Sequence, residues 1–214
     1  MGNPLKGGLI GCGYFSANHL NAWRDVEGAD LTAVCDLDLD KAQACAAEFG
    51  IEAVYSDPEV MLSEVGLDFV DIVTQPHTHR ELVELAARHR TPVICQKPMA
   101  PSLAEAEAMV SACDKAGVPF MVHENFRWQA PMRAVAAAAA EIGPLFFGRI
   151  SFRSAFDVYT DQPYLATDPR FIIYDLGVHA LDLARFFMGE VGQLCCHTQR
   201  VNPAIRAEDV ATML

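Results

Sequence analysis

Three polar side chains interrupt an otherwise apolar stretch, residues 174–187, that has the period of a helix. Asp175, His179 and Asp182 follow one another at spacings of four and three residues, so a helix stacks them on one face. A carboxylate one turn before an imidazole can fix the tautomer and orientation of the ring, as a general base requires. The alternative is a structural histidine whose polar atoms are satisfied inside the core.

Lys97 is a second candidate for proton chemistry, in the segment CQKPMA that follows an expected buried strand. In a mostly apolar loop the surroundings can shift the charge state of a lysine, and the lysine can share a proton with a substrate hydroxyl. The alternative is an ordinary surface lysine. The segment TQPHTH, residues 74–79, follows another expected strand, and ligands of open α/β sheets sit at such carboxyl ends. A cofactor contact and a simple loop role are both open for its two histidines, His77 and His79.

The segment GLIGCGYFSANH, residues 8–19, places Gly11 and Gly13 between an expected strand and an expected helix. Two glycines there let the backbone turn tightly and approach a pyrophosphate at the helix N-terminus. Ser16 stands where the third glycine of G-x-G-x-x-G is usual, and a small residue still permits close packing. Asp36 ends the next expected strand about 20 residues later, where a carboxylate binds the hydroxyls of an adenosine ribose. No arginine follows it to receive a 2′-phosphate, so the pattern favours NAD over NADP. The alternative is a pair of turn glycines and an aspartate that caps the next helix.

These candidates need a scaffold, and the first half of the chain alternates short apolar runs with helical patterns. This alternation predicts βαβ units and a parallel sheet. Two pairs, Ser102 with Glu105 and Thr78 with Glu81, have the spacing of a capping box at a helix start. The expected strands are residues 5–11, 31–36, 52–55, 69–74, 91–96 and 118–123.

After Gly143 the pattern changes to long β-type stretches at residues 145–156 and 191–201, and AEDVATML at the end looks like one more strand. Such a shift predicts a second, α+β domain. We therefore divide this α/β protein into residues 1–123 and residues 124–214. A sheet that stopped at Leu214 would have an unpaired edge, so we expect a chain that is truncated or only partly covered.

Composition excludes several classes of partner. A net charge of −12 argues against nucleic acid and against an anionic membrane surface, and no apolar run reaches the length of a membrane span. Seven cysteines without a C-x-x-C pair indicate reduced thiols, and hence a cytoplasmic protein. No set of residues has the spacing of a metal site, so we expect no metal.

Taken in order, these motifs resemble the Gfo/Idh/MocA oxidoreductases, the glucose-fructose oxidoreductase and inositol dehydrogenase group. The matching segments are the G-x-G, Asp36, Q-K-P at 96–98, H-E-N-F-R at 123–127 and D-x-G-x-H-x-x-D at 175–182. The resemblance implies an NAD-binding Rossmann domain at residues 1–123. It also implies a C-terminal α+β domain at residues 124–214, whose open, mostly antiparallel sheet often forms the interface of a homo-oligomer. Two departures are Gln96 in place of the usual glutamate and a chain shorter than is usual in the family.

The resemblance further implies the site. The catalytic residues would be Lys97, Asp175 and His179. Asp175 and His179 would also hold the substrate. Asn125 and Arg127 in the segment HENFRW are further candidates to line the substrate pocket, and Arg127 could equally tie the two domains together. Tyr159, Tyr164 and Arg170, in the irregular segment before the site helix, could add specificity, since loops tend to carry such contacts. The cofactor would be held by Gly11, Gly13, Tyr14, Phe15, Asp36, Thr74, Pro76, His79, Gln96 and Lys97.

We expect His179 to take the proton of a secondary hydroxyl of a sugar, sugar derivative or polyol while hydride passes to the nicotinamide. Lys97 would polarise the oxygen and Asp175 would orient the histidine. One alternative is a glycosidase of the same family that uses NAD transiently. Another is a dinucleotide-binding regulatory protein without turnover.

Overall fold

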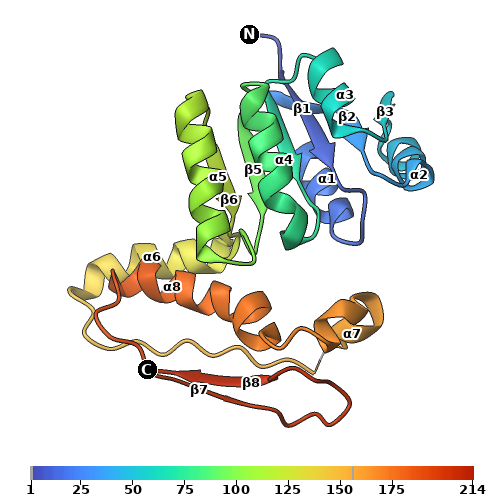
Figure 1. The fold of residues 1–214 in the computed structure, drawn as a ribbon. Coiled ribbons are helices and arrows are strands. Elements are labelled where there is room, and N and C mark those ends of the chain that lie inside the picture. Colours follow the sequence, from blue (N-terminus) through green and yellow to red (C-terminus); the bar gives the residue numbers. More distant parts are fainter. Residues whose placement is uncertain (1, 156) are drawn as a thin grey trace. The chain divides into compact units, whose positions relative to one another are not determined.

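The computed structural model describes residues 2–155 and 157–214, and these form two compact units, Met1–His123 and Glu124–Leu214. Each unit has its own helices and strands and its own apolar core (Figure 1).

The first unit contains a six-stranded parallel sheet in the order β3-β2-β1-β4-β5-β6. Every strand that the sequence analysis expected within residues 1–123 is present, with ends that differ by at most two residues. The strands are β1 (Leu5–Ile10), β2 (Ala29–Cys35), β3 (Ala53–Tyr55), β4 (Phe69–Ile72), β5 (Val93–Gln96) and β6 (Phe120–His123). Because β1 lies between β2 and β4, the connections run outward in both directions from β1. Ligands of such sheets bind beyond the carboxyl ends of the strands at this switch point.

Five helices cover the two faces of this sheet. They are α1 (Ser16–Arg24), α2 (Leu39–Phe49), α3 (Pro58–Glu64), α4 (Pro76–Arg88) and α5 (Leu103–Ala116). Side chains of α3, α4 and α5 pack into one apolar cluster with Val70 and Ile72 of β4. Side chains of α1 and α2 pack into another cluster with Leu9 and Val34. The two clusters explain why all four residues of β4 and the last four of β1 are buried, since parallel strands are covered on both faces.

Of the two capping boxes predicted at helix starts, one is present in the structure. Ser102 caps α5 as predicted: its Oγ accepts the Glu105 N–H at 3.3 Å and donates to the Glu105 carboxylate at 3.0 Å. The start predicted at Thr78 is wrong, because α4 begins two residues earlier at Pro76. Proline is favoured in the first helical turn, and the Thr78 hydroxyl instead donates within that turn to Gln75 O at 2.9 Å.

The second unit is an α+β arrangement with a two-stranded antiparallel sheet of β7 (Cys196–Gln199) and β8 (Val210–Met213). Its helical segments are a 3₁₀ turn, Phe126–Trp128, then α6 (Ala130–Ile142), α7 (Val158–Asp161), a second 3₁₀ turn, Pro163–Ala166, a π-helical turn, Ile172–Gly177, and α8 (Val178–Met188). A small core of Leu165, Phe171, Ile205 and Ala207 joins the segment before α8 to the loop between the two strands.

The β-type stretch predicted at residues 145–156 is wrong over residues 145–155, which contain no strand; residue 156 lies outside the described residues. Of the stretch predicted at residues 191–201, only Cys196–Gln199 pairs as a strand. A strand requires ladder hydrogen bonds to a neighbour, and apolar alternation alone does not supply them. The strand expected in AEDVATML is confirmed as β8. No helix in the described part of the chain combines the length and apolar character needed to cross a membrane.

Candidate functional site

The glycine-containing loop between β1 and α1 is shaped by two glycines in different ways. Gly11 has φ +101°, and a Cβ there would lie 2.7 Å from Val73 O. This backbone conformation and close approach both require glycine. At Gly13 a Cβ would meet nothing within 4 Å, so the loop leaves open space beside that backbone.

Asp36, directly after β2, holds this loop in place. Its Oδ2 accepts the Cys12 N–H at 2.8 Å, and its Oδ1 accepts the Asp38 N–H at 2.9 Å. At the start of α1, the N-cap residue Phe15 makes no side-chain hydrogen bond to the helix, and the N–H groups of Ser16 and Asn18 donate to the backbone oxygens of Gly13 and Phe15, both at 3.1 Å. No side chain therefore caps the positive end of the helix, where an anion is favoured. Open space at Gly13 and an uncapped helix N-terminus are what a pyrophosphate needs, and the residues present therefore fit a dinucleotide. Tyr14 and Phe15 beside them are exposed.

The loops after β4 and β5 carry the other cofactor candidates at the same edge of the sheet. Thr74, Pro76 and Lys97 are half-buried there, and Gln96 is the buried last residue of β5. Their contacts with a cofactor remain predictions.

The cofactor contact predicted for His79 is wrong. Its side chain is 0% exposed, and its two ring nitrogens lie 3.1 Å from Met99 O and 3.0 Å from Thr74 O. The buried ring thus links the loop after β4 to the loop after β5 from the interior of the unit. Burial lowers the pKa of His79, which favours a neutral ring. Sequence reasoning placed His79 at the mouth of a loop, but α4 begins earlier and turns its side chain into the core.

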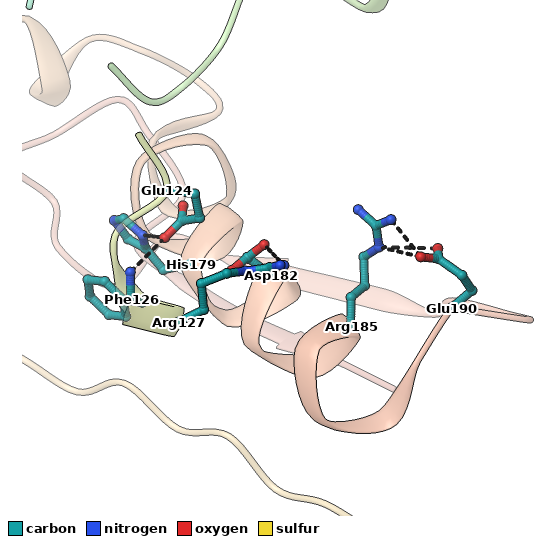
Figure 2. A network of polar contacts seen from close by, with 7 residues as sticks. All are labelled: Glu124, Phe126, Arg127, His179, Asp182, Arg185 and Glu190. Atoms are coloured by element: carbon teal, nitrogen blue, oxygen red, sulfur yellow. Dashed lines mark hydrogen bonds and ion pairs between the residues drawn. The ribbon is translucent and has the colours of Figure 1, made fainter. Parts of the chain in front are cut away.

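In the second unit, His179 of α8 is buried and bonded to a carboxylate from the start of the unit. Its Nδ1 lies 2.5 Å from Glu124 Oε1, and its ring stacks on Phe126 with 3.9 Å between ring centroids (Figure 2). Glu124 Oε1 also accepts the Phe126 N–H at 3.2 Å. The hydrogen bond to Glu124 and the stacking on Phe126 together therefore fix the orientation of the imidazole ring.

The sequence analysis predicted that Asp175 orients the His179 ring. In the structure it is Glu124 whose carboxylate contacts His179 Nδ1. Asp175 lies in the π-helical turn Ile172–Gly177 ahead of α8, a rare conformation that is frequent at functional sites. Burial raises the pKa of the Tyr164 phenol, and the negative charge of Asp175 nearby raises it further. Asp175 thus contributes to the electrostatics around Tyr164.

Arg127 is paired with Asp182 of α8. Its Nε donates to Asp182 Oδ2 at 2.7 Å and its Nη2 donates to Asp182 Oδ1, a two-point contact drawn in Figure 2. The guanidinium also lies 5.4 Å from the ring centroid of Phe186. This pair fastens the turn that contains Arg127 to α8. Asn125 precedes that turn and is half-buried, and its contact with substrate remains a prediction.

The buried histidines differ in how many ring nitrogens the protein already uses. His19 and His79 have both nitrogens bonded to protein groups. For His179, the hydrogen bonds found among the described residues involve Nδ1, so Nε2 keeps its capacity to take a proton. A carboxylate on one nitrogen and an open second nitrogen is the arrangement of a general base.

Glu124 is a functional candidate that sequence reasoning missed. The residue stands inside the segment H-E-N-F-R, which was noted as a motif, but only Asn125 and Arg127 were selected from it. The available signal was an acidic residue directly after the last strand of the first unit.

Both halves of the chain match models of one protein family. Residues 5–124 match the model described as "Oxidoreductase family, NAD-binding Rossmann fold", and residues 116–214 match the "GFO/IDH/MocA C-terminal domain".

Proteins of known name or structure match most of this chain. It is 58% identical over 212 residues to "D-apiose dehydrogenase" from Paraburkholderia graminis, covering 98% of this chain and 56% of that protein. It is 28% identical over 188 residues to "Myo-inositol 2-dehydrogenase" from Thermotoga maritima, covering 87% of this chain and 55% of that protein. A crystal structure of an oxidoreductase from Agrobacterium radiobacter in complex with NAD+, L-tartaric acid and magnesium is 54% identical with a TM-score of 0.96, and covers 99% of this chain and 62% of that one. The chain thus spans little more than half the length of these relatives.

Proposed function

Because the chain belongs to the Gfo/Idh/MocA family of oxidoreductases, we propose that its protein is an NAD-dependent dehydrogenase of a sugar, sugar derivative or polyol. The observation that carries this proposal is the 58% identity to a D-apiose dehydrogenase along 98% of this chain. D-apiose is therefore the first substrate to test. In a cyclic sugar the reacting group is a ring carbon that bears a hydroxyl, either a secondary alcohol or the anomeric carbon.

In this proposal the first unit binds the dinucleotide. Backbone N–H groups at the start of α1 and the space beside Gly13 receive the pyrophosphate, and Asp36 holds the adenosine ribose. When bound, NAD supplies the acceptor for the hydride. Thr74, Pro76, Gln96 and Lys97 border the cofactor from the loops after β4 and β5.

The second unit contributes the base. His179 takes the hydroxyl proton on Nε2, and Glu124 stabilises the resulting positive charge through its bond to Nδ1. Lys97 donates to the same substrate oxygen and favours its negative charge as the proton leaves. Acid and base catalysis of this kind is typically worth about 10²- to 10⁴-fold in rate.

Asp175 and Asn125 are proposed to hold substrate hydroxyls. A carboxylate accepts two hydroxyl hydrogen bonds side by side, which suits neighbouring hydroxyls of a sugar. Arg127 already donates to Asp182, so we assign it the placement of the turn before α6 as well as the predicted substrate contact.

The test is a screen of D-apiose, other sugars and inositols with NAD and NADP in parallel, followed by NADH or NADPH fluorescence. Lys97→Ala and His179→Ala should each lose about 10²-fold or more of kcat with the substrate found. Lys115→Ala, at the far end of α5, is the matched surface control. Near-full turnover in both site variants would overturn the proposed roles. Release of sugar from a glycoside without net NADH would instead support a glycosidase, and NADH binding without any turnover would support a regulatory protein.

We also propose that the protein is cytoplasmic and assembles as a homo-oligomer through the sheet of its second unit. All seven cysteines are free, and the adjacent Cys195 and Cys196 are exposed, as expected in a reducing compartment. In the described residues β7 and β8 form a two-stranded sheet, so each is an edge strand whose backbone can pair with another chain. Light scattering after size exclusion measures the oligomeric state, and a monomer would contradict this assembly.

A further inference from the structure

A buried polar network in the first unit ends at Gln96 and Lys97, two of the residues proposed to border the cofactor. At its centre is His19 of α1, 5% exposed, whose Nδ1 lies 2.8 Å from Oδ2 of Asp71 on β4. Its Nε2 lies 3.2 Å from Nε2 of Gln96, the last residue of β5. Gln96 Oε1 in turn accepts the backbone N–H of Lys97 at 2.6 Å. The chain of contacts therefore runs from a carboxylate in the middle of the sheet to the backbone of the proposed catalytic lysine.

One contact, between Gln96 and the Lys97 backbone, fixes which atom donates and which accepts in every hydrogen bond of this network. A backbone N–H only donates, so the Gln96 atom that faces Lys97 N is the amide oxygen, and the NH₂ group faces His19. Because that NH₂ group also donates, His19 Nε2 accepts and carries no proton. The proton of the neutral ring is therefore on Nδ1, where it is donated to Asp71. Each member thus fixes the orientation of the next.

The surroundings leave the imidazole little freedom. Trp23 Nε1 donates to the same Asp71 oxygen at 2.8 Å, and Asp71 is 1% exposed. The ring of His123 on β6 lies 4.5 Å from that of His19, and Phe15 meets His19 edge-on at 5.7 Å, both between ring centroids. His19 therefore contacts groups from the N-cap of α1, β4, β5 and β6.

We propose that His19 and Asp71 are positioning residues for Lys97, acting through the Gln96 side chain, which they hold in the orientation that fixes the Lys97 backbone. The effect on the chemical step rests on the proposed function, because it needs Lys97 to act on substrate. A displacement of about 1 Å at a reacting group can cost about 10²-fold in rate. We therefore expect His19→Phe, which keeps a ring but loses both hydrogen bonds, to lower kcat by about that factor while KM for NAD changes little.

The first experiment needs no turnover. In protein with ¹⁵N-labelled histidine, long-range ¹H–¹⁵N spectra should show His19 protonated on Nδ1 and unprotonated on Nε2, with the resonance assigned by its loss in His19→Asn. Gln96→Glu replaces the NH₂ donor that faces Nε2 by a carboxyl group, so a proton on Nε2 in that variant would support the proposed polarity. A protonated Nε2 in the wild type would overturn it.

The second experiment follows the backbone amide of Lys97. Its short hydrogen bond to Gln96 predicts a downfield proton signal that moves upfield and exchanges faster in His19→Phe and in Asp71→Asn. His89→Asn is the matched control, because His89 forms an equally short pair with Glu59, 2.8 Å from Nε2 to Oε1, on the surface at the end of α4. An unchanged Lys97 amide in both variants would refute the positioning role, whatever substrate the protein accepts.

Turnover then separates positioning from mere support of the fold. A drop in kcat in His19→Phe, with NADH affinity retained, supports the proposal, whereas an unchanged kcat in a variant that unfolds at lower urea would assign the network to stability alone. If the wild type turns over no substrate, the proposed function fails, and the two spectroscopic results still decide the network.

Discussion

Removal of the Glu124 carboxylate should slow catalysis by weakening the hold on His179. The side chains of His179 and Glu124 are only 7% and 16% exposed, so water cannot replace the lost bond fully. A hydrogen bond to a charged group contributes about 1.5–3 kcal/mol, and about 1.4 kcal/mol corresponds to tenfold in rate. We therefore expect Glu124→Ala to lower kcat by about 10- to 10²-fold. Glu124→Gln keeps a neutral acceptor for Nδ1–H and should lose about tenfold or less.

The assay is NADH formation at saturating NAD with the substrate found in the screen, and urea unfolding of each variant controls for folding. Glu190→Gln serves as the matched variant, because Glu190 pairs with Arg185 at the exposed end of α8 (Figure 2). Its kcat should stay at the wild-type value. If Glu124→Ala retained kcat within about twofold while remaining folded, the orienting role would be refuted.

Three further perturbations test the site and its support. Gly11→Ala should destabilise the fold by roughly 1–3 kcal/mol, because Gly11 has a left-handed φ and an added Cβ would collide with the backbone just after β4. Gly13→Ala should leave the urea midpoint unchanged and weaken NADH binding, which fluorescence measures. Arg127→Met should cost about 1–3 kcal/mol in urea unfolding, because Asp182 is left unpaired, and the addition of Asp182→Leu should restore part of that loss. The lowered pKa of His79 means that the unfolded chain binds more protons, so stability should fall as pH drops through about 6.5 towards the folded-state pKa. Urea midpoints should show a smaller acid loss in His79→Gln, and equal slopes with pH would contradict this.

The parallel sheet could be predicted because its signal lies in the local sequence. In β4, for example, three of the four residues are apolar and all four are buried, as expected of a parallel strand covered on both faces. Asp36 and Gly11 stand where such a sheet binds nucleotides. The segment 145–155 shows the limit of the same reasoning. Its residues have strand propensity, but pairing depends on a neighbour that a local pattern does not specify.

The site residues show a related limit. Asp175 was selected because helical spacing places it one turn from His179, and such spacing identifies neighbours within one helix only. Glu124 is 55 residues away in sequence and reaches the ring from a different element. No periodicity connects these two residues, so only the packing of the segment after β6 against α8 reveals the pair.

The two histidine–carboxylate pairs of this chain look alike in distance but differ in what they can do. His19 and His179 each contact a carboxylate more than 50 residues away, at 2.8 Å and 2.5 Å. For His19 the Gln96 amide donates to the second nitrogen, so a proton taken there would face another donor and break the link to Lys97. The hydrogen bonds that the described residues make to His179 leave its second nitrogen able to accept. The first pair is therefore suited to holding a shape and the second to moving a proton, and the partner of the second nitrogen decides between these roles.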